Sequence, residues 1–488
     1  MIQKYALEFK IIILLILGLI LKGLYIGETN LGLDECFSVY VSQLSPSEII
    51  TYLSHGDNPP LWELVLNLWV NFFGHSELSV RIPSLIFNIA TIIPIALIGE
   101  KYIGKHVGTS AALLFIFSNF SLFIAHEARV YSLLGLLTTT SIYLFLSALN
   151  STKTIKYLLI LTVVNTLIVY SHYLGIWIII MQFLLFICFK DIRHHLRQQY
   201  WIHLIGVFSL VSPLLTTLIQ RFQESGLSGT WIPTVNGFEP LYNMIWTFSN
   251  KPLPTVIFIV ILIAAFIKYM IKLPKAKNRY HFLILLFFFV PFILSFALSF
   301  KIGLFLDRYF YFLLPLFMLV IMTATKYMTH SLPKQNLFLL LPVILLATTF
   351  STKSGQFKFS GYHTDVKSVV GEIKILTKNP DNAILVCPSF YDKQIVYYLD
   401  NSLFSNYIED YNALSVFYKP LNELNIFPIM HASEINFESQ PKRIILIDHQ
   451  ADFNAPNHQI RLYLKENYSE NYSYEVGGDV FSIYDLNQ

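Results

Sequence analysis

Charged residues are scarce in this sequence. Of its 488 residues, 13% are charged and 54% are hydrophobic, whereas an ordinary soluble domain carries about 25% charged residues. Leu, Ile and Phe occur in runs and do not alternate with polar residues. A chain of this length is expected to form two or three domains. Its composition indicates that one of them lies in a membrane.

Cysteine is also rare, and the three present, Cys36, Cys188 and Cys387, form no CxxC pair. This spacing excludes a cysteine zinc site and a disulfide framework, although one Cys36–Cys387 bridge stays open. The sequence also lacks a Gly-rich phosphate loop, an internal repeat and a basic stripe. Nothing in it therefore indicates nucleotide or nucleic-acid binding.

The long apolar runs are the main positive signal. A membrane-spanning helix needs about 20 apolar residues, because the bilayer core offers no water to unpaired backbone groups. Such runs lie near residues 11–27, 82–99, 108–125, 131–149, 157–171, 175–189, 202–220, 254–271, 282–300, 309–325 and 336–350. We therefore expect a polytopic α-helical membrane protein with about eleven transmembrane helices. Residues 157–189 are too many for one span, and His172 is expected to mark a turn between two short ones.

Lys and Arg indicate how these helices are oriented, because they favour cytoplasmic loops. With a cytoplasmic N-terminus, sixteen Lys and Arg fall inside and seven fall outside or in nearby helices. Eleven spans then place residues 351–488 outside. Residues 1–350 form the transmembrane domain, and its long outer loops are residues 28–81 and 221–253. The stretch Leu61–Trp69 in the first loop is expected to form an amphipathic helix in the membrane interface.

Beyond residue 350 the composition changes. Residues 1–350 hold 23 Lys/Arg against 14 Asp/Glu, while residues 351–488 hold 11 against 17. Short apolar runs at Ala383–Val386 and Arg443–Ile447 predict buried strands, and Val366–Leu376 and Lys393–Leu399 predict helices. We expect a small extracytoplasmic α/β domain here.

Polar residues gather where the outer loops meet the spans. Asp34 and Glu35 follow the first span, where a charge close to hydrocarbon usually faces a cavity or serves a function. This pair is either a general base or metal ligand, or a solvated interfacial pair. His55, Asp57 and Asn58 precede two prolines that restrict the backbone. That rigid turn is either a place for a metal or an acceptor, or simply the start of a helix.

Two further groups lie at other outer helix ends. Glu127, Arg129 and Tyr131 share one tight turn, and three polar side chains at a membrane boundary favour a functional site. The segment from Lys301 to Asp307-Arg308-Tyr309 lies at the outer end of the tenth span, where the Arg308 guanidinium is able to bind phosphate through two hydrogen bonds. The alternative is interfacial anchoring. His172 is either a polar turn residue or a ligand, and Glu77 and Arg81 are spaced as a structural i, i+4 pair.

Together these motifs, in this order, resemble those of a known family. They resemble the membrane glycosyltransferases related to protein O-mannosyltransferases and lipid A aminoarabinose transferases, which share the C-type glycosyltransferase fold. The resemblance covers roughly residues 10–320. The motifs are Asp34-Glu35, Asp57-Asn58-Pro59-Pro60-Leu61, Glu77-x-x-x-Arg81-x-Pro83, Glu127-Ala128-Arg129-x-Tyr131-Ser132 and Asp307-Arg308-Tyr309-x-x-x-Leu313-x-Pro315.

The resemblance implies a role for each candidate residue. Asp34, with Glu35 beside it, would be the catalytic carboxylate, and Arg129 and Arg308 would bind the donor phosphate with Tyr131 and Lys301. We expect the two arginines to converge with Asp34 on one outer cavity. His55, Asp57, Asn58 and His172 would shape the loop or bind the acceptor.

The resemblance leaves metal dependence open, because some family members bind a divalent cation and others do not need one. Glu127 and Asp34 would be the ligands here. Two departures bear on this point. The Pro-Pro turn often follows His in the family but follows Asn58 in this chain, and Glu127 stands where the second loop often supplies Asp. Both departures weaken the expectation of a metal.

The implied function is an inverting glycosyltransferase, either a hexosyltransferase or a pentosyltransferase. It would move a sugar from a polyprenyl-phosphate donor to a lipid, glycan or protein acceptor in the cell envelope. The implied location is the bacterial plasma (inner) membrane, with the active site outside. The alternatives are a transporter or lipid flippase, a polysaccharide polymerase or ligase of another fold, and a non-catalytic sensor.

Overall fold

The computed structural model divides the chain into two compact units. The helical unit comprises Met1–Ile26, Asp57–Trp62 and Arg81–Ser360, and the mixed unit comprises Gly27–Gly56, Glu63–Val80 and Gly361–Gln488. The first outer loop is therefore largely grouped with the C-terminal part of the chain. The structure describes residues 2–54, 58–217, 219–220, 223, 232–271, 279–329, 335–354, 365–404, 415–437, 441–449 and 459–485.

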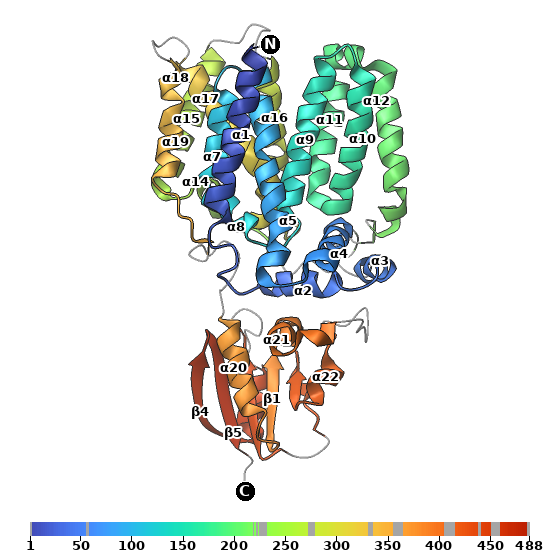
Figure 1. The fold of residues 1–488 in the computed structure, drawn as a ribbon, viewed down its shortest axis with the longest axis vertical. Coiled ribbons are helices and arrows are strands. Elements are labelled where there is room, and N and C mark those ends of the chain that lie inside the picture. Colours follow the sequence, from blue (N-terminus) through green and yellow to red (C-terminus); the bar gives the residue numbers. More distant parts are fainter. Residues whose placement is uncertain are drawn as a thin grey trace. The chain divides into compact units, whose positions relative to one another are not determined.

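The helical unit is built from apolar helices that pack side by side (Figure 1). In its first half these are α1 (Ile2–Gly23), α5 (Glu77–Ala90), α6 (Ile92–Ile98), the π-helical turn η1 (Gly99–Ile103), α7 (Val107–Ile116), α8 (Asn119–Ala125), α9 (Tyr131–Leu149) and α10 (Thr154–Ser171). In its second half they are η2 (Tyr173–Gly175), α11 (Ile176–Cys188), α12 (Lys190–Val211), η3 (Ser212–Leu214), α14 (Glu239–Ser249), α15 (Pro252–Ile271), α16 (Arg279–Leu298), η5 (Asp307–Leu313), α17 (Leu314–Thr329), α18 (Gln335–Phe338) and α19 (Leu340–Ala347).

Each of the eleven expected spans overlaps helix in the described part of the chain. Among the described residues, six helical segments are long and apolar enough to cross a membrane, and two bent helix pairs raise that number to eight. The chain is thus an integral membrane protein by these criteria. The shorter apolar helices Tyr173–Cys188 and Gln335–Ala347 occupy two more of the expected positions. The count of eleven spans stays a prediction.

The two bent pairs are joined to each other by one side chain. The α7–α8 axis bends by 64° and the α14–α15 axis by 104°. Asn250, between α14 and α15, accepts a hydrogen bond from the Asn119 backbone N–H (2.8 Å) and donates one to the Phe117 carbonyl (2.9 Å). Backbone groups released at a break must find partners where no water is available. Asn250 supplies two of these partners.

The break expected at His172 is confirmed. Helix α10 ends at Ser171, and His172 has extended backbone angles (φ −161°, ψ 134°) before η2 and α11 begin. The His172 Nδ1 atom accepts the Leu174 backbone N–H at 3.2 Å, so the side chain caps the following turn. This position brings the His172 ring to one end of the helical unit.

Lys22, near the end of α1, is fully buried in the helical unit. Its Nζ atom donates to Asn88 Oδ1 (2.8 Å), Ser121 Oγ (2.6 Å) and the Phe115 carbonyl (3.2 Å). Asn88 Nδ2 in turn donates to the Tyr311 hydroxyl at 2.6 Å. A buried ammonium is costly unless its protons are hydrogen-bonded. This network fills that need and joins α1, α5, α7, α8 and η5.

Three short helices of the first outer loop belong wholly or mostly to the mixed unit. They are α2 (Leu33–Val41), α3 (Pro46–Ser54) and α4 (Leu61–Phe73). Asn67 Nδ2 donates to the Ser42 and Leu44 carbonyls at 2.8 and 3.0 Å, and Ser38 Oγ donates to Glu63 Oε1 at 3.0 Å. The expected helix over Leu61–Trp69 is confirmed as the larger part of α4. The loop is therefore a packed structure.

The rest of the mixed unit is a five-stranded sheet with helices. Its strands are β1 (Asn382–Cys387), β2 (Ile426–Pro428), β3 (Arg443–Asp448), β4 (Ser469–Val476) and β5 (Asp479–Asp485), in the order β2-β1-β3-β5-β4. Strands β2, β1 and β3 are parallel, while β5 and β4 are antiparallel to their neighbours. The helices are α20 (Val366–Leu376), η7 (Ser389–Tyr391), α21 (Asp392–Leu399), η8 (Asn401–Phe404), α22 (Tyr418–Asn422), η9 (Ala432–Glu434) and α24 (Gln459–Asn467).

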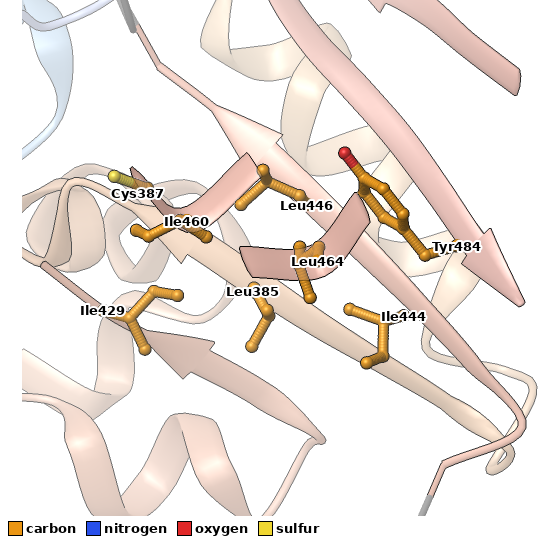
Figure 2. Close-up of a cluster of buried hydrophobic side chains, with 8 residues drawn as sticks. All are labelled: Leu385, Cys387, Ile429, Ile444, Leu446, Ile460, Leu464 and Tyr484. Carbon is orange, nitrogen blue, oxygen red and sulfur yellow. The ribbon is translucent and has the colours of Figure 1, made fainter. Parts of the chain in front are cut away.

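Strand β1 is buried along its whole length, as expected for a central parallel strand. A cluster of apolar side chains from β1, β3, β5, α24 and the residue after β2 forms one core of the sheet (Figure 2). Its buried members are Leu385, Cys387, Ile429, Ile444, Leu446, Ile460, Leu464 and Tyr484. Cys36 and Cys387 are both buried and free, so the bridge left open by the sequence is not formed.

Candidate functional site

Asp34 and Glu35 occupy the first turn of α2, where the helix dipole favours negative charge. The two carboxylates have different surroundings. Glu35 is buried and its Oε2 atom accepts the Gly32 backbone N–H at 2.8 Å, which satisfies a backbone donor at the helix start. Asp34 is half-buried. The Glu35 contact is structural, so Asp34 is the better candidate for chemistry.

A second group of candidate residues lies in the helical unit, on the turn between α8 and α9. Arg129 is buried, and its backbone is held on both sides. The Arg129 N–H donates to the Glu127 carbonyl (2.8 Å), and Ser84 Oγ donates to the Arg129 carbonyl (3.3 Å). Trp62 Nε1 donates to the Ala128 carbonyl at 3.1 Å. Several hydrogen bonds therefore fix the backbone that carries the Arg129 side chain.

Arg308 approaches the same region from another element. It is the second residue of η5, and its Cζ atom lies 6.0 Å from the centroid of the Tyr131 ring, within cation–π range. Tyr131 is the first residue of α9 and is buried. Arg308 and Tyr131 are 177 positions apart in the sequence, and tertiary folding alone brings them together.

His172 and Tyr309 complete this group. The two rings meet edge to face with 5.0 Å between centroids, and the Tyr131 ring lies 6.1 Å from His172 and 6.2 Å from Tyr309. Tyr309 was not among the residues expected in the site. Its sequence signal was its place in the Asp307-Arg308-Tyr309 motif, where no role was assigned to it. We name Arg129, Tyr131, His172, Arg308 and Tyr309 the two-arginine cluster.

The electrostatics of His172 show that both guanidiniums act on it. Burial, and to a smaller extent the positive charges of Arg129 and Arg308, together lower the pKa of His172 to about 4. The ring is therefore neutral at pH 7. Because Nδ1 accepts a backbone N–H, the ring proton resides on Nε2. His172 thus adds a neutral N–H donor to two cationic ones.

Asp307 supplies a carboxylate beside this cluster. It begins η5, is partly buried, and its Oδ2 atom accepts Thr247 Oγ1 of α14 at 3.3 Å. This bond ties the start of η5 to α14. Asp307 belongs to the expected Asp307-Arg308-Tyr309 motif but had no assigned role, and Thr247 was not expected in the site. Their contact positions the backbone from which Arg308 projects.

The remaining expected residues lie elsewhere or outside the described residues. Lys301 is exposed on the turn after α16, and its backbone N–H donates to the Leu298 carbonyl at 3.0 Å. Asn58 is half-buried just before α4. His55 and Asp57 lie outside the described residues. The structure therefore brings Arg129, Tyr131, Arg308 and His172 together. The expected convergence with Asp34, which belongs to the other unit, stays a prediction.

Metal ligands are not clustered in the described part of the chain. No group of three or more His, Cys, Asp or Glu side chains there is arranged to hold an ion. The expected ligands, Glu127 and Asp34, belong to different units. A cation held by Glu127 and Asp34 stays a prediction, and no chemical step is assigned to one.

A family model for dolichyl-phosphate-mannose-protein mannosyltransferases matches residues 57–216. This range includes Glu127, Arg129, Tyr131 and His172 of the site. No curated protein matches the chain. The family match therefore covers about a third of the sequence, and it falls on the part that carries most of the motifs.

Solved structures resemble the chain over nearly its full length. One is ArnT from Cupriavidus metallidurans bound to undecaprenyl phosphate, with a TM-score of 0.60 and 10% identity, covering 97% of both chains. Another is the archaeal oligosaccharyltransferase AglB from Archaeoglobus fulgidus in complex with an inhibitory peptide and a dolichol-phosphate. It has a TM-score of 0.54 and 12% identity, covering 100% of this chain and 75% of that one.

These likenesses confirm the resemblance stated from the motifs. The chain shares the fold of ArnT and AglB, with a mostly helical part and a small sheet. At 10–12% identity they establish the fold and leave the substrate undecided.

Proposed function

We propose that this chain is an inverting glycosyltransferase that moves a sugar from a polyprenyl-phosphate donor to an acceptor at the outer face of the membrane. The observation that supports this most directly is the two-arginine cluster, in which Arg129 and Arg308 both act on the buried ring of His172. Two guanidiniums close together repel each other, so such an arrangement is favourable when an anion lies between them. A lipid phosphate is an anion of the required kind.

The cluster suits a phosphate that leaves during the reaction. As the bond between the anomeric carbon and the phosphate oxygen breaks, negative charge grows on that oxygen. Arg129 and Arg308 would stabilise this charge through charge-assisted hydrogen bonds, and the Nε2–H of His172 would add a neutral donor. Because His172 is neutral at pH 7, it would bind the phosphate as a neutral hydrogen-bond donor and would not act as an imidazolium acid.

Asp34 would act on the acceptor. Its carboxylate would take the proton of the acceptor hydroxyl or amine while the acceptor oxygen or nitrogen attacks the anomeric carbon. The new glycosidic bond forms as the bond to phosphate breaks, which releases polyprenyl phosphate and inverts the anomeric centre. Glu35 would hold the first turn of α2 through its bond to Gly32.

Purified protein in lipid nanodiscs tests this proposal. It would be incubated with labelled polyprenyl-phosphate hexoses and pentoses and with lipid, glycan and peptide acceptors. We expect transfer with at least one donor and release of free polyprenyl phosphate in equal amount. Arg308→Lys tests the cluster, and Arg279→Lys is its matched control, because Arg279 forms an ion pair with Asp191 (2.6 Å) elsewhere in the helical unit.

A transporter would behave differently in the same material. If no donor supports transfer, but proteoliposomes move the lipid-linked sugar from one leaflet to the other, the glycosyltransferase proposal is wrong and the transporter alternative is right. Adding EDTA to an active sample separates a metal-dependent enzyme from a metal-independent one.

A further inference from the structure

Helix α21, in the C-terminal part of the chain, forms hydrogen bonds with the segment just before Asp34. Leu31 is fully buried, and both of its backbone polar groups bond to α21. The Leu31 N–H donates to the Tyr398 hydroxyl at 2.7 Å, and Gln394 Nε2 donates to the Leu31 carbonyl at 2.6 Å. A two-sided contact of this kind fixes the position and the direction of the backbone at Leu31.

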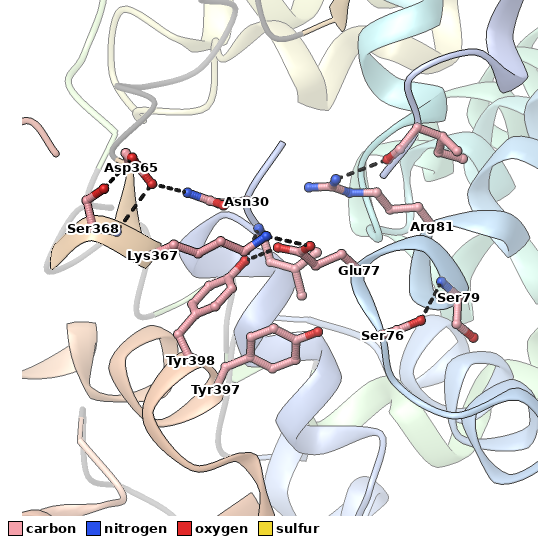
Figure 3. Close-up of polar contacts among 12 residues, drawn as sticks. Asn30, Ser76, Glu77, Ser79, Arg81, Asp365, Lys367, Ser368, Tyr397 and Tyr398 are labelled. Atoms are coloured by element: carbon pink, nitrogen blue, oxygen red, sulfur yellow. Dashed lines mark hydrogen bonds and ion pairs between the residues drawn. The ribbon is translucent and has the colours of Figure 1, made fainter. Parts of the chain in front are cut away.

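The Tyr398 hydroxyl makes a second bond that extends this contact. It donates to Glu77 Oε1 at 2.6 Å, and Lys367 Nζ donates to Glu77 Oε2 at 2.9 Å (Figure 3). Burial and the neighbouring Glu77 carboxylate raise the pKa of Tyr398, so its hydroxyl keeps its proton. The hydroxyl therefore accepts from Leu31 and donates to Glu77 at the same time.

Other contacts join the same two parts of the mixed unit. Tyr397 OH donates to the His75 carbonyl at 2.8 Å. Asn30 Nδ2 donates to Asp365 Oδ1 at 3.1 Å (Figure 3). On the buried face of α2, the Tyr40 ring packs against Phe417 with 5.2 Å between centroids. Both the residues that precede α2 and α2 itself therefore pack against the C-terminal part of the mixed unit.

The residue after Leu31, Gly32, is hydrogen-bonded to two residues in the first turn of α2, on the far side of Asp34. The Gly32 N–H donates to Glu35, and the Cys36 N–H donates to the Gly32 carbonyl at 3.0 Å. Movement of Leu31 would therefore be transmitted to the first turn of α2, where Asp34 lies.

We infer that Gln394 and Tyr398 are positioning residues. Their hydrogen bonds to the backbone of Leu31 hold the Asp34 carboxylate in place for catalysis. This inference rests on the proposed function only for its effect on turnover. The C-terminal part of the chain then contributes to the reaction without touching the donor or the acceptor. Displacing a catalytic group by about 1 Å lowers the rate by about 10²-fold, so small losses of contact have measurable effects.

The variants Tyr398→Phe and Gln394→Met test the inference. Each removes the polar group that bonds to Leu31 and keeps most of the side-chain volume. The matched controls are Tyr472→Phe and Gln459→Met, since both residues are exposed in the same unit. We expect kcat to fall about 10- to 100-fold in the two test variants, with KM for the donor within about twofold of wild type and no loss in the controls.

Amide hydrogen exchange provides a readout that needs no activity. In Tyr398→Phe we expect exchange at Leu31–Cys36 to become at least about 10-fold faster, while peptides from α20 and β3 keep their wild-type rates. Unchanged exchange at Leu31–Cys36 would overturn the inference, as would faster exchange with wild-type kcat in an active preparation. If wild type transfers no sugar, the proposed function fails, and faster exchange still supports the hold of α21 on this segment.

Discussion

The Arg308 guanidinium lies over the Tyr131 ring, with 6.0 Å between its Cζ atom and the ring centroid. This contact joins the start of η5 to the first residue of α9. It also places Arg308 beside His172, whose pKa responds to both Arg308 and Arg129. The proposal that this site binds the donor phosphate depends on these contacts. Its first test replaces the planar guanidinium of Arg308.

Arg308→Lys keeps the positive charge and removes the planar, bidentate donor. We expect kcat/KM for the lipid-phosphate donor to fall about 10²-fold, in line with loss of a preorganised donor at a leaving oxygen. The control Arg279→Lys should stay within about twofold of wild type. Steady-state transfer by both purified variants measures the difference. Equal activity in the two would remove Arg308 from the phosphate site.

His172 predicts a specific dependence of stability on pH. In the unfolded chain the imidazole takes up a proton below its ordinary pKa of 6.5, whereas in the folded protein it stays neutral down to about 4. The unfolded state therefore binds more protons between these values, so stability falls as the pH falls from 6.5 to 4. The whole effect amounts to about 3 kcal/mol.

The variant His172→Asn should lose that part of the pH dependence. Thermal unfolding in detergent at several pH values between 4 and 7 measures it. His431→Asn, at an exposed position of the mixed unit, should show the same pH dependence as wild type. If His172→Asn and wild type lose stability equally between pH 6.5 and 4, His172 is not held neutral in the folded protein.

Asp34→Asn is expected to abolish transfer without unfolding the protein. Asn matches Asp in shape but takes up no proton at neutral pH, and loss of a general base costs about 10²–10⁴-fold in rate. Glu35→Gln should cost far less, because its amide oxygen is still able to accept the Gly32 N–H. Transfer rates and thermal midpoints of both variants distinguish the roles. A larger loss of transfer from Glu35→Gln would reverse the assignment.

Cysteine labelling tests the predicted orientation, in which residues 351–488 lie outside. In a Cys188→Ser background, which removes the exposed native thiol, a membrane-impermeant maleimide added from outside should label Lys442→Cys but not Lys190→Cys. Lys442 is suitable because its side chain is 80% exposed, and Lys190 is exposed at the start of α12. Labelling of Lys190→Cys alone would place residues 351–488 in the cytoplasm.

The sequence by itself predicted the elements whose signal is local. Apolar runs marked the helices of the membrane part, and the polar interruption at His172 marked the break between α10 and η2. Residues Val366–Leu376 were predicted as a helix and form α20 with the same bounds. The two predicted strands form β1 and β3. In each case one stretch of chain carries the whole signal, as burial and periodicity do.

Other elements were missed because their signal is weak within the segment itself. Strand β4 is largely exposed and rich in polar residues, so it lacks the apolar run that marked β1. It forms by pairing with β5 across a tight turn in which Gly477 and Gly478 have positive φ. Strand β2 is only three residues long. Pairing with a neighbour stabilises such strands, and no local pattern reveals it.

The candidate site shows the same division. The sequence identified Arg129, Tyr131, His172 and Arg308 separately, as polar groups at helix ends, because a polar residue at a membrane boundary stands out in any apolar chain. It did not predict that Tyr309 joins them, or that Gln394 and Tyr398 bond to the backbone of Leu31. These contacts join residues up to 367 positions apart. They depend on the packing of whole helices and strands, and only the tertiary structure decides which side chains that packing brings together.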